Sequence, residues 1–151
     1  MPTHRICKSF VVESGHMLSK HPESCRFPHG HTRRIEVVCS RPTLDENDMV
    51  VDFKALKLAL KCFINQLDHR MALNSSDPLR EDIERVYPDS VVVFEDQDPT
   101  TEVLAKWIFE FVAQVLAKGF ETGAYRIPAG QVTLERIRVW ETETSWAEYG
   151  P

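Results

Sequence analysis

Polar and apolar residues alternate in two segments near the start of the chain. The first runs from Arg5 to Val12, and its parity continues to His16, while the second runs from about Gly30 to Ser40. Alternate side chains of a β-strand point to the same face, so each segment predicts a strand with one buried face. Antiparallel pairing of the two strands brings His16 toward the start of the second strand.

Two later segments have apolar residues at helical spacing. Asp52 is a good N-cap for a helix that runs to about Leu67. A second helix is predicted with Asp98 as its N-cap and Pro99 at the first helical position. It ends at Gly119. Both helices have an apolar stripe that must pack against another layer of the protein.

The remaining segments are shorter. In chain order they are a helix-closing turn at 68–74, an irregular segment at 75–98 with a short helix (78–86) and a short strand (91–94), a third strand at 131–141 and a fourth at 146–149. The order of the main elements is therefore β-β-α-α-β-β. It predicts one α+β domain, residues 1–151, in which two helices cover an antiparallel four-stranded sheet. Such a sheet has open edges, which favour pairing with other subunits.

The composition of the 151 residues is that of a soluble globular protein, with 42% hydrophobic and 27% charged residues. A net charge of −5 argues against a nucleic-acid or anionic-membrane partner, because such proteins usually carry a basic surplus. We expect no membrane-spanning segment and no export signal, hence a cytoplasmic protein. The four cysteines form no C-x-x-C pair, and we expect them to be reduced.

Two histidines of one predicted strand favour a metal site. His29 and His31 flank Gly30 and share one face, and His16 comes close if the two strands pair. An H-x-H motif by itself often arises by chance. The alternative interpretation is that the two histidines are ordinary polar residues at the start of a half-exposed strand. Three imidazoles together favour zinc and leave one coordination position open, as in catalytic sites.

Cys25 lies ahead of these histidines and has three interpretations. As a fourth zinc ligand it closes the site and makes it structural. As a free thiol beside metal and imidazoles it acts as a base or nucleophile. As an inert loop cysteine it has no chemical role.

Two further positions carry candidate acid–base or binding chemistry. Asp68 and His69 place a carboxylate next to an imidazole at a helix end, where histidine is often only a cap. Glu141 follows two apolar residues of the same parity, so it is solvated, paired or in contact with a ligand.

Together these residues resemble the family of 6-pyruvoyltetrahydropterin and 6-carboxytetrahydropterin synthases. Each motif is weak alone, but the ordered set is specific and spans most of the chain. The motifs are Phe10 with Ser14-Gly15-His16, Cys25 with His29-Gly30-His31, Met49-Val50-Val51-Asp52-Phe53, Leu67-Asp68-His69, Pro99-Thr100-Thr101-Glu102 and Val139-Trp140-Glu141-Thr142. The three-residue gap between Cys25 and His29 is similar to the carboxytetrahydropterin branch.

The resemblance implies a lyase that converts 7,8-dihydroneopterin triphosphate to 6-carboxy-5,6,7,8-tetrahydropterin, acetaldehyde and triphosphate, on the route to queuosine and related deazapurines. It also implies the tunnelling fold, in which two trimers stack into a homohexamer with active sites between subunits. The implied residue roles are zinc binding for His16, His29 and His31, general base for Cys25, proton relay for Asp68 and His69, pterin anchor for Glu141, and pterin positioning for Thr100, Thr101 and Glu102.

This chain also departs from the family pattern. Arg33 stands where an aromatic residue usually follows the two histidines, and the segments at 68–74 and 74–99 are longer than in compact members. The candidates for binding the triphosphate are Lys20, Arg26, Arg33 and Arg34, with solvated surface charge as the alternative. Two other functions stay open. One is a pyruvoyltetrahydropterin synthase, with internal redox transfer instead of side-chain cleavage. The other is a non-catalytic zinc or pterin binder whose site Cys25 closes.

Overall fold

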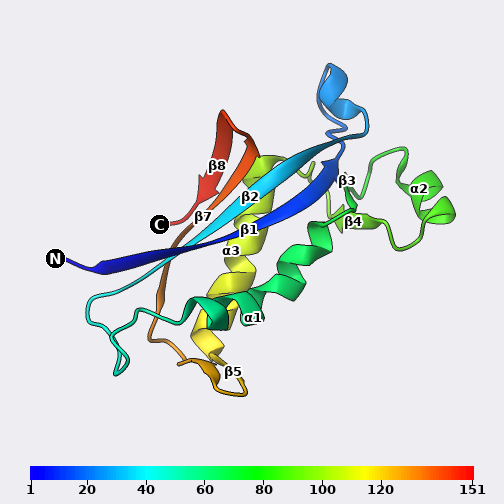
Figure 1. Cartoon of the computed structure of the whole chain (residues 1–151). Coiled ribbons are helices and arrows are strands. Elements are labelled where there is room, and N and C mark those ends of the chain that lie inside the picture. Colours follow the sequence, from blue (N-terminus) through cyan, green and yellow to red (C-terminus); the bar gives the residue numbers. More distant parts are fainter.

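The computed structural model describes all residues, 1–151, and has one mixed sheet with two long helices packed on one of its faces (Figure 1). None of the helices combines the length and the apolar character needed to cross a bilayer. All four cysteines are unpaired. The elements are β1 (His4–His16), the 3₁₀ turn η1 (Ser24–Arg26), β2 (His29–Arg41), α1 (Phe53–Ile64), the 3₁₀ turn η2 (Asn65–Leu67), β3 (Met71–Asn74), α2 (Arg80–Val86), β4 (Val91–Phe94), α3 (Thr101–Lys118), β5 (Phe120–Thr122), β6 (Tyr125–Ile127), β7 (Thr133–Thr142) and β8 (Ser145–Tyr149).

The two N-terminal strands form the longest pairing of the sheet. β1 and β2 are antiparallel along their whole length, from His4 opposite Arg41 to His16 opposite His29. They run side by side across the molecule in Figure 1. The predicted pairing is confirmed, and β1 reaches four residues beyond the predicted end at Val12. His16 is thus a strand residue with a fixed partner.

The sheet differs from the prediction of four antiparallel strands. It has six strands in the order β4-β3-β1-β2-β7-β8, and β3 is parallel to both β1 and β4. Met71–Asn74, predicted to be a turn, is β3, whose last three residues are buried. A short strand covered on both faces has no alternation of polar and apolar residues, which is why the pattern did not reveal it. The small β5–β6 hairpin was also missed.

The core lies between the helices and the inner face of the sheet. α3 packs on β7 and β8, while α1 packs on β1. Fully buried aliphatic side chains each contribute about 1.5–3 kcal/mol, so this layer holds the strands in place. The central members are Ile35 and Val37 of β2, Leu56 and Leu60 of α1, Leu104 and Ile108 of α3, and Ile137 and Val139 of β7.

The predicted start of one helix is confirmed and that of the other is wrong. Asp52 caps α1, since its carboxylate accepts a hydrogen bond from the Lys54 amide at 2.7 Å. Thr100 caps α3, where its hydroxyl accepts from the Val103 amide at 3.2 Å, so the helix begins two residues later than predicted. Asp98 is buried and accepts hydrogen bonds from other segments instead. α3 ends before Gly119, as predicted.

Candidate metal and pterin site

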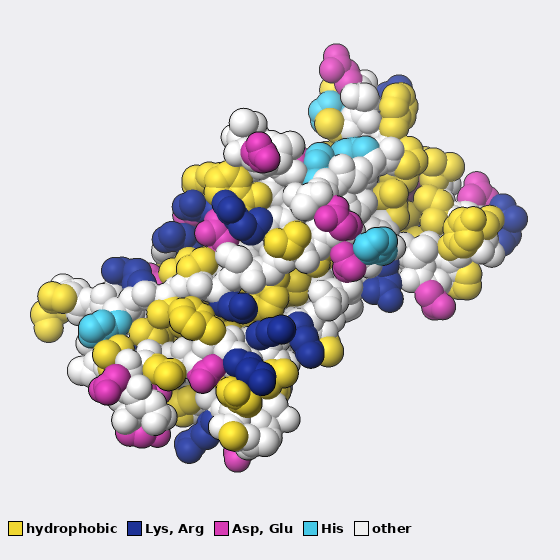
Figure 2. Space-filling model, viewed as in Figure 1, with side chains coloured by type: hydrophobic (Ala, Val, Ile, Leu, Met, Phe, Trp, Pro, Cys, Tyr) yellow, Lys and Arg dark blue, Asp and Glu magenta, His cyan; other side chains and the backbone are white.

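Three histidines meet at one end of the β1–β2 pair. His16 ends β1, and His29 and His31 begin β2. Their ring centroids lie 4.5 to 5.1 Å apart, and one ligand nitrogen from each falls within 4.8 Å of the others. Figure 2 shows histidine side chains gathered at the end of the molecule where the loop after β1 lies. The three histidines that were predicted to form a metal site therefore lie together in the structure.

Backbone carbonyls fix the orientation of two of these rings. Nδ1 of His16 lies 2.8 Å from the Pro99 carbonyl oxygen, and Nδ1 of His29 lies 2.8 Å from that of Phe27. A carbonyl only accepts, so Nδ1 carries the proton in each ring and Nε2 keeps its lone pair. In His16 that free nitrogen faces Nε2 of His31 at 3.1 Å.

The electrostatic surroundings favour neutral imidazoles. Burial lowers the pKa of His16 to about 4, against the opposing effect of the hydrogen bond to Pro99, and the nearby Arg33 charge lowers it further. Burial and Arg33 also lower the pKa of His31. Metals bind the neutral form of histidine, so these groups need to lose no proton at neutral pH.

The donor set fits a divalent metal ion. Three neutral imidazoles suit zinc and also other transition metals, and three protein ligands leave a position for substrate or water. Cys25 is outside the group of ligand atoms that lie within 4.8 Å of one another. Its thiol is partly buried in η1. The grouped ligand atoms are therefore those of the three histidines alone.

The loop that carries Cys25 is tied to the rest of the protein through Asp98. The Asp98 carboxylate accepts hydrogen bonds from the Ser19 hydroxyl at 2.6 Å, the Lys20 amide at 2.8 Å and the Asn74 side-chain amide at 3.0 Å. It therefore joins the loop, the end of β3 and the start of α3. This role is not evident from the sequence, because an acidic residue before proline has the pattern of a helix cap.

Asp68 and His69 lie together in the turn before β3. One oxygen of Asp68 accepts from the Glu13 amide at 2.8 Å, and the other lies 3.0 Å from Nδ1 of His69. The first of these bonds, and then the His69 contact, lower the pKa of the Asp68 carboxyl. His69 has a left-handed backbone (φ 57°), and its side chain is 79% exposed. The pair points into solvent from a turn hydrogen-bonded to β1.

Glu141 of β7 lies beside the histidine cluster. Its Oε1 atom is 3.9 Å from Nε2 of His16 and 3.8 Å from Nε2 of His31. The buried Thr101 hydroxyl lies 3.1 Å from the same oxygen. Thr100 is engaged as the cap of α3. Glu102 is exposed and has no hydrogen bond or ion pair to Glu141, so the structure brings Thr101, but not Glu102, into contact with it.

Arg33 is not a surface residue. It has no exposed area, because its position on β2 has the inward parity of His29 and His31. Its Nη1 atom donates to the Thr101 hydroxyl at 3.0 Å, and Nη2 lies 3.3 Å from Nδ1 of His16. The expectation of either a triphosphate-binding or a solvated arginine is therefore wrong for Arg33. Arg34, of opposite parity, lies over the Trp140 ring on the other face of the sheet.

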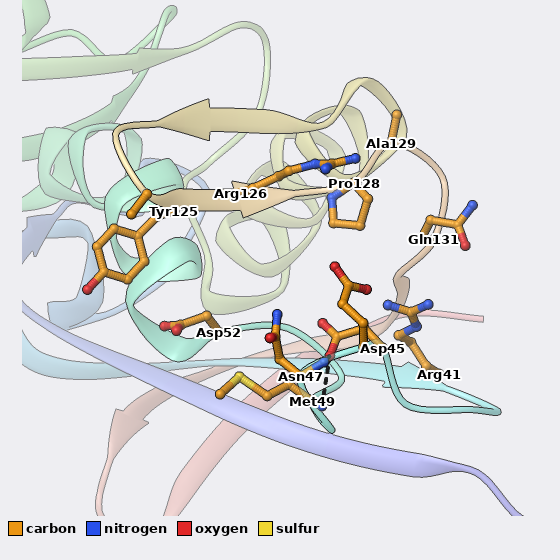
Figure 3. Close-up of a pocket in the computed structure, with 12 residues that line it drawn as sticks. Arg41, Asp45, Asn47, Met49, Asp52, Tyr125, Arg126, Pro128, Ala129 and Gln131 are labelled. Carbon is orange, nitrogen blue, oxygen red and sulfur yellow. Dashed lines mark hydrogen bonds between the residues drawn. The ribbon is translucent and has the colours of Figure 1, made fainter.

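Two surface cavities lie away from the histidine cluster. The larger, about 880 Å³, is lined by the turn after β2 and by the β5–β6 hairpin (Figure 3). Arg41 in its wall ends β2, whereas His29 begins that strand. A smaller cavity of about 450 Å³ lies beside Asp68 and His69, with Tyr87 in its wall. Only the smaller one adjoins a predicted site residue.

The fold and the cluster define a small α+β protein with three histidines placed so that they could hold a metal ion, and a three-histidine donor set is typical of catalytic zinc sites. The sequence profile of the family described as 6-pyruvoyl tetrahydropterin synthase matches residues 5–151. The chain belongs to this family. The expectation of an enzyme of the tetrahydropterin synthase family is thus confirmed.

One relative and two solved structures are similar to this chain. The 6-carboxy-5,6,7,8-tetrahydropterin synthase of Aquifex aeolicus is 32% identical over 162 aligned residues, which cover 95% of this chain and 96% of the relative. An uncharacterized protein of Wolinella succinogenes has a similar structure, with a TM-score of 0.78, 23% identity and coverage of 99% of both chains. The 6-pyruvoyl tetrahydropterin synthase of Caenorhabditis elegans has a TM-score of 0.65 at 19% identity, covering 100% of this chain and 97% of that one. These structures share the fold.

Proposed function

We propose that this protein is a 6-carboxy-5,6,7,8-tetrahydropterin synthase. It converts 7,8-dihydroneopterin triphosphate and one water molecule to 6-carboxytetrahydropterin, acetaldehyde and triphosphate, on the route to queuosine and related deazapurines. The observation that carries the proposal is the position of the Glu141 carboxylate within 4 Å of two ligand nitrogens of the histidine cluster. A pterin held by this carboxylate lies beside the three histidines. The name of the Aquifex aeolicus relative supports the carboxypterin product.

The metal is zinc, held by Nε2 atoms of His16, His29 and His31. The hydrogen bonds of His16 and His29 to backbone carbonyls support this assignment, since they leave Nε2 free. Zinc supplies Lewis acidity, which polarises substrate hydroxyls and acidifies their neighbouring C–H bonds.

The proton transfers belong to Cys25 and to the Asp68–His69 pair. Cys25 removes a proton from the substrate side chain with its Sγ atom. Because Nδ1 of His69 lies against Asp68, the other nitrogen, Nε2, exchanges the second proton with the substrate or with water. Asp68 is itself held by the Glu13 amide, which keeps it ionised and the imidazole oriented.

Recognition of the pterin ring belongs to Glu141 and to the start of α3. A carboxylate accepts two parallel N–H bonds, which matches the adjacent N–H donors of a pterin. Thr100, Thr101 and Glu102 position the ring. The direct contact of Thr101 with Glu141 supports this role for Thr101.

The assembly is a hexamer, a dimer of trimers with active sites between subunits. The edge strands β4 and β8 are unpaired on one side, so they offer main-chain groups to neighbouring copies. The exposed His69 side chain suits a site that a second subunit completes. Light scattering on the purified protein tests this directly, with a mass of six chains as the expected result.

Product analysis tests the proposed reaction. The zinc-loaded protein is incubated with 7,8-dihydroneopterin triphosphate, and the products are identified by mass spectrometry. Acetaldehyde together with 6-carboxytetrahydropterin is the expected result. A product with a diketo side chain identifies a pyruvoyltetrahydropterin synthase instead, and no turnover at all favours the non-catalytic binder.

A further inference from the structure

Arg33 places a full positive charge inside the protein, directly behind the site. Arginine is almost never fully buried without partners, because its charge loses its hydration. Here the side chain has no exposed area, and β2 holds it two residues beyond His31.

The guanidinium has few partners in this environment. Nη1 donates to the Thr101 hydroxyl at 3.0 Å, while Nε has no hydrogen-bond partner. Nη2 lies against the His16 ring, 3.3 and 3.4 Å from its two nitrogens. The Thr101 hydroxyl is therefore the one oxygen to which this side chain donates a hydrogen bond.

This contact sets the direction of the next hydrogen bond. A guanidinium only donates, so the Thr101 oxygen uses a lone pair for Arg33. A carboxylate only accepts, so the Thr101 hydrogen goes to Oε1 of Glu141, 3.1 Å away. Linked hydrogen bonds of this kind polarise one another, and the positive end lies at Arg33. One oxygen of Glu141 is thereby held in a fixed place.

We propose that Arg33 is a positioning residue for substrate recognition, which orients the Glu141 carboxylate through the Thr101 hydroxyl. The inference rests on the proposed function, in which Glu141 binds the N–H donors of a pterin. Arg33 itself touches no substrate. Through Thr101, Arg33 keeps one oxygen of the Glu141 carboxylate hydrogen-bonded. The remaining lone pairs of the carboxylate are directed at the pterin ring.

The test is a double-mutant cycle on the zinc-loaded full chain. The variants are Arg33→Met, Thr101→Val and their combination, with Thr101→Ser as the variant that keeps the hydroxyl and Arg33→Lys as the one that keeps the charge. Arg138→Gln is the matched control, because this arginine of β7 has the opposite parity to Glu141 and pairs with Glu148. The readouts are zinc content and the affinity for neopterin, an unreactive oxidised pterin, measured by its fluorescence.

We expect Arg33→Met and Thr101→Val each to weaken neopterin binding about tenfold or more, the usual effect of losing a hydrogen bond to a charged group. The double variant is no weaker than either single one, because both changes break the same path. Thr101→Ser and Arg138→Gln keep wild-type affinity, and Arg33→Lys recovers part of it. If Arg33→Met does not fold, the affinity of Thr101→Val is compared instead with the affinities of Thr101→Ser and Arg33→Lys.

Additive losses in the double variant, or unchanged affinity in Arg33→Met, contradict the inference and leave the proposed function intact. Wild-type protein that binds no neopterin contradicts the proposed function. A crystal structure of a soluble Arg33 variant then tests the positioning role by itself. A rotated Glu141 carboxylate supports that role, and an unmoved carboxylate contradicts it.

Discussion

Nε2 of His16 and Nε2 of His31 lie 3.1 Å apart at the end of the β1–β2 pair. The strand register places His31 opposite Ser14 and His16 opposite His29, so the three rings converge from two strands. Because Nδ1 of His16 donates to the Pro99 carbonyl, its Nε2 lone pair faces the other rings. The cluster thus offers convergent lone pairs before any metal binds.

This geometry predicts one zinc ion per chain and a large stabilisation on binding. Zinc at 100 times its dissociation constant adds about 2.7 kcal/mol to the free energy of unfolding, which raises the melting temperature by roughly 5–10 °C. His31→Ala removes both the metal and this shift, as measured by elemental analysis and calorimetry. His21→Ala, in the loop between the same strands, is the control and keeps both. An equal shift in the two variants contradicts the assignment.

Cys25→Ala separates the open site from a closed one. Since Cys25 lies outside the ligand cluster, the variant is expected to keep one zinc per chain and its melting temperature. Turnover falls by about 10²–10⁴-fold, the usual contribution of a general base. Cys62→Ala, which changes an exposed thiol of α1, is the matched control with normal turnover. Loss of zinc and of folding in Cys25→Ala is the result that supports a structural site.

Glu141→Gln tests the pterin anchor. The amide keeps the shape of the side chain but replaces one acceptor with a donor, which faces the N–H groups of the ring. We expect neopterin affinity to fall at least about tenfold, with zinc content unchanged, as measured by fluorescence titration and elemental analysis. Glu143→Gln, in the exposed turn after β7, is the control. Equal affinity in wild type and Glu141→Gln removes Glu141 from the site.

Asp98 is expected to make stability depend on acid pH. Burial raises the pKa of its carboxyl, but hydrogen bonds from Ser19, Asn74 and Lys20 outweigh that effect and lower it below the ordinary value. A lowered pKa means that the stabilisation is complete above about pH 4 and is lost as pH falls through the folded-state pKa. Asp98→Asn should therefore cost about 1–3 kcal/mol at pH 7 and progressively less below pH 4, in urea unfolding. The exposed Asp89→Asn is the control. A difference that does not shrink in acid contradicts this role.

The long strands and the histidine cluster could be predicted from the sequence because each depends on local alternation. His16, His29 and His31 share the inward parity of buried residues, and antiparallel pairing then brings them together. The helix α1 could also be predicted, because Asp52 is a common N-cap residue and Leu56 and Leu60 repeat at helical spacing.

The features that were missed depend on contacts between distant segments. Arg33 has the same inward parity as His31, yet a charged residue at a strand start is ordinarily exposed, and its partner Thr101 lies 68 residues away. Asp98 has the pattern of a helix cap, but Ser19 and Asn74 take up its carboxylate. β3 is too short to show a period, and its pairing with β1 and β4 decides its conformation.

The most direct test of the account is a crystal structure of the protein with zinc and neopterin bound. It is expected to show zinc on Nε2 of His16, His29 and His31, the pterin ring on the Glu141 carboxylate, and the Cys25 thiol next to the pterin side chain. Cys25 bound to zinc as a fourth ligand, with the pterin elsewhere or absent, would contradict it.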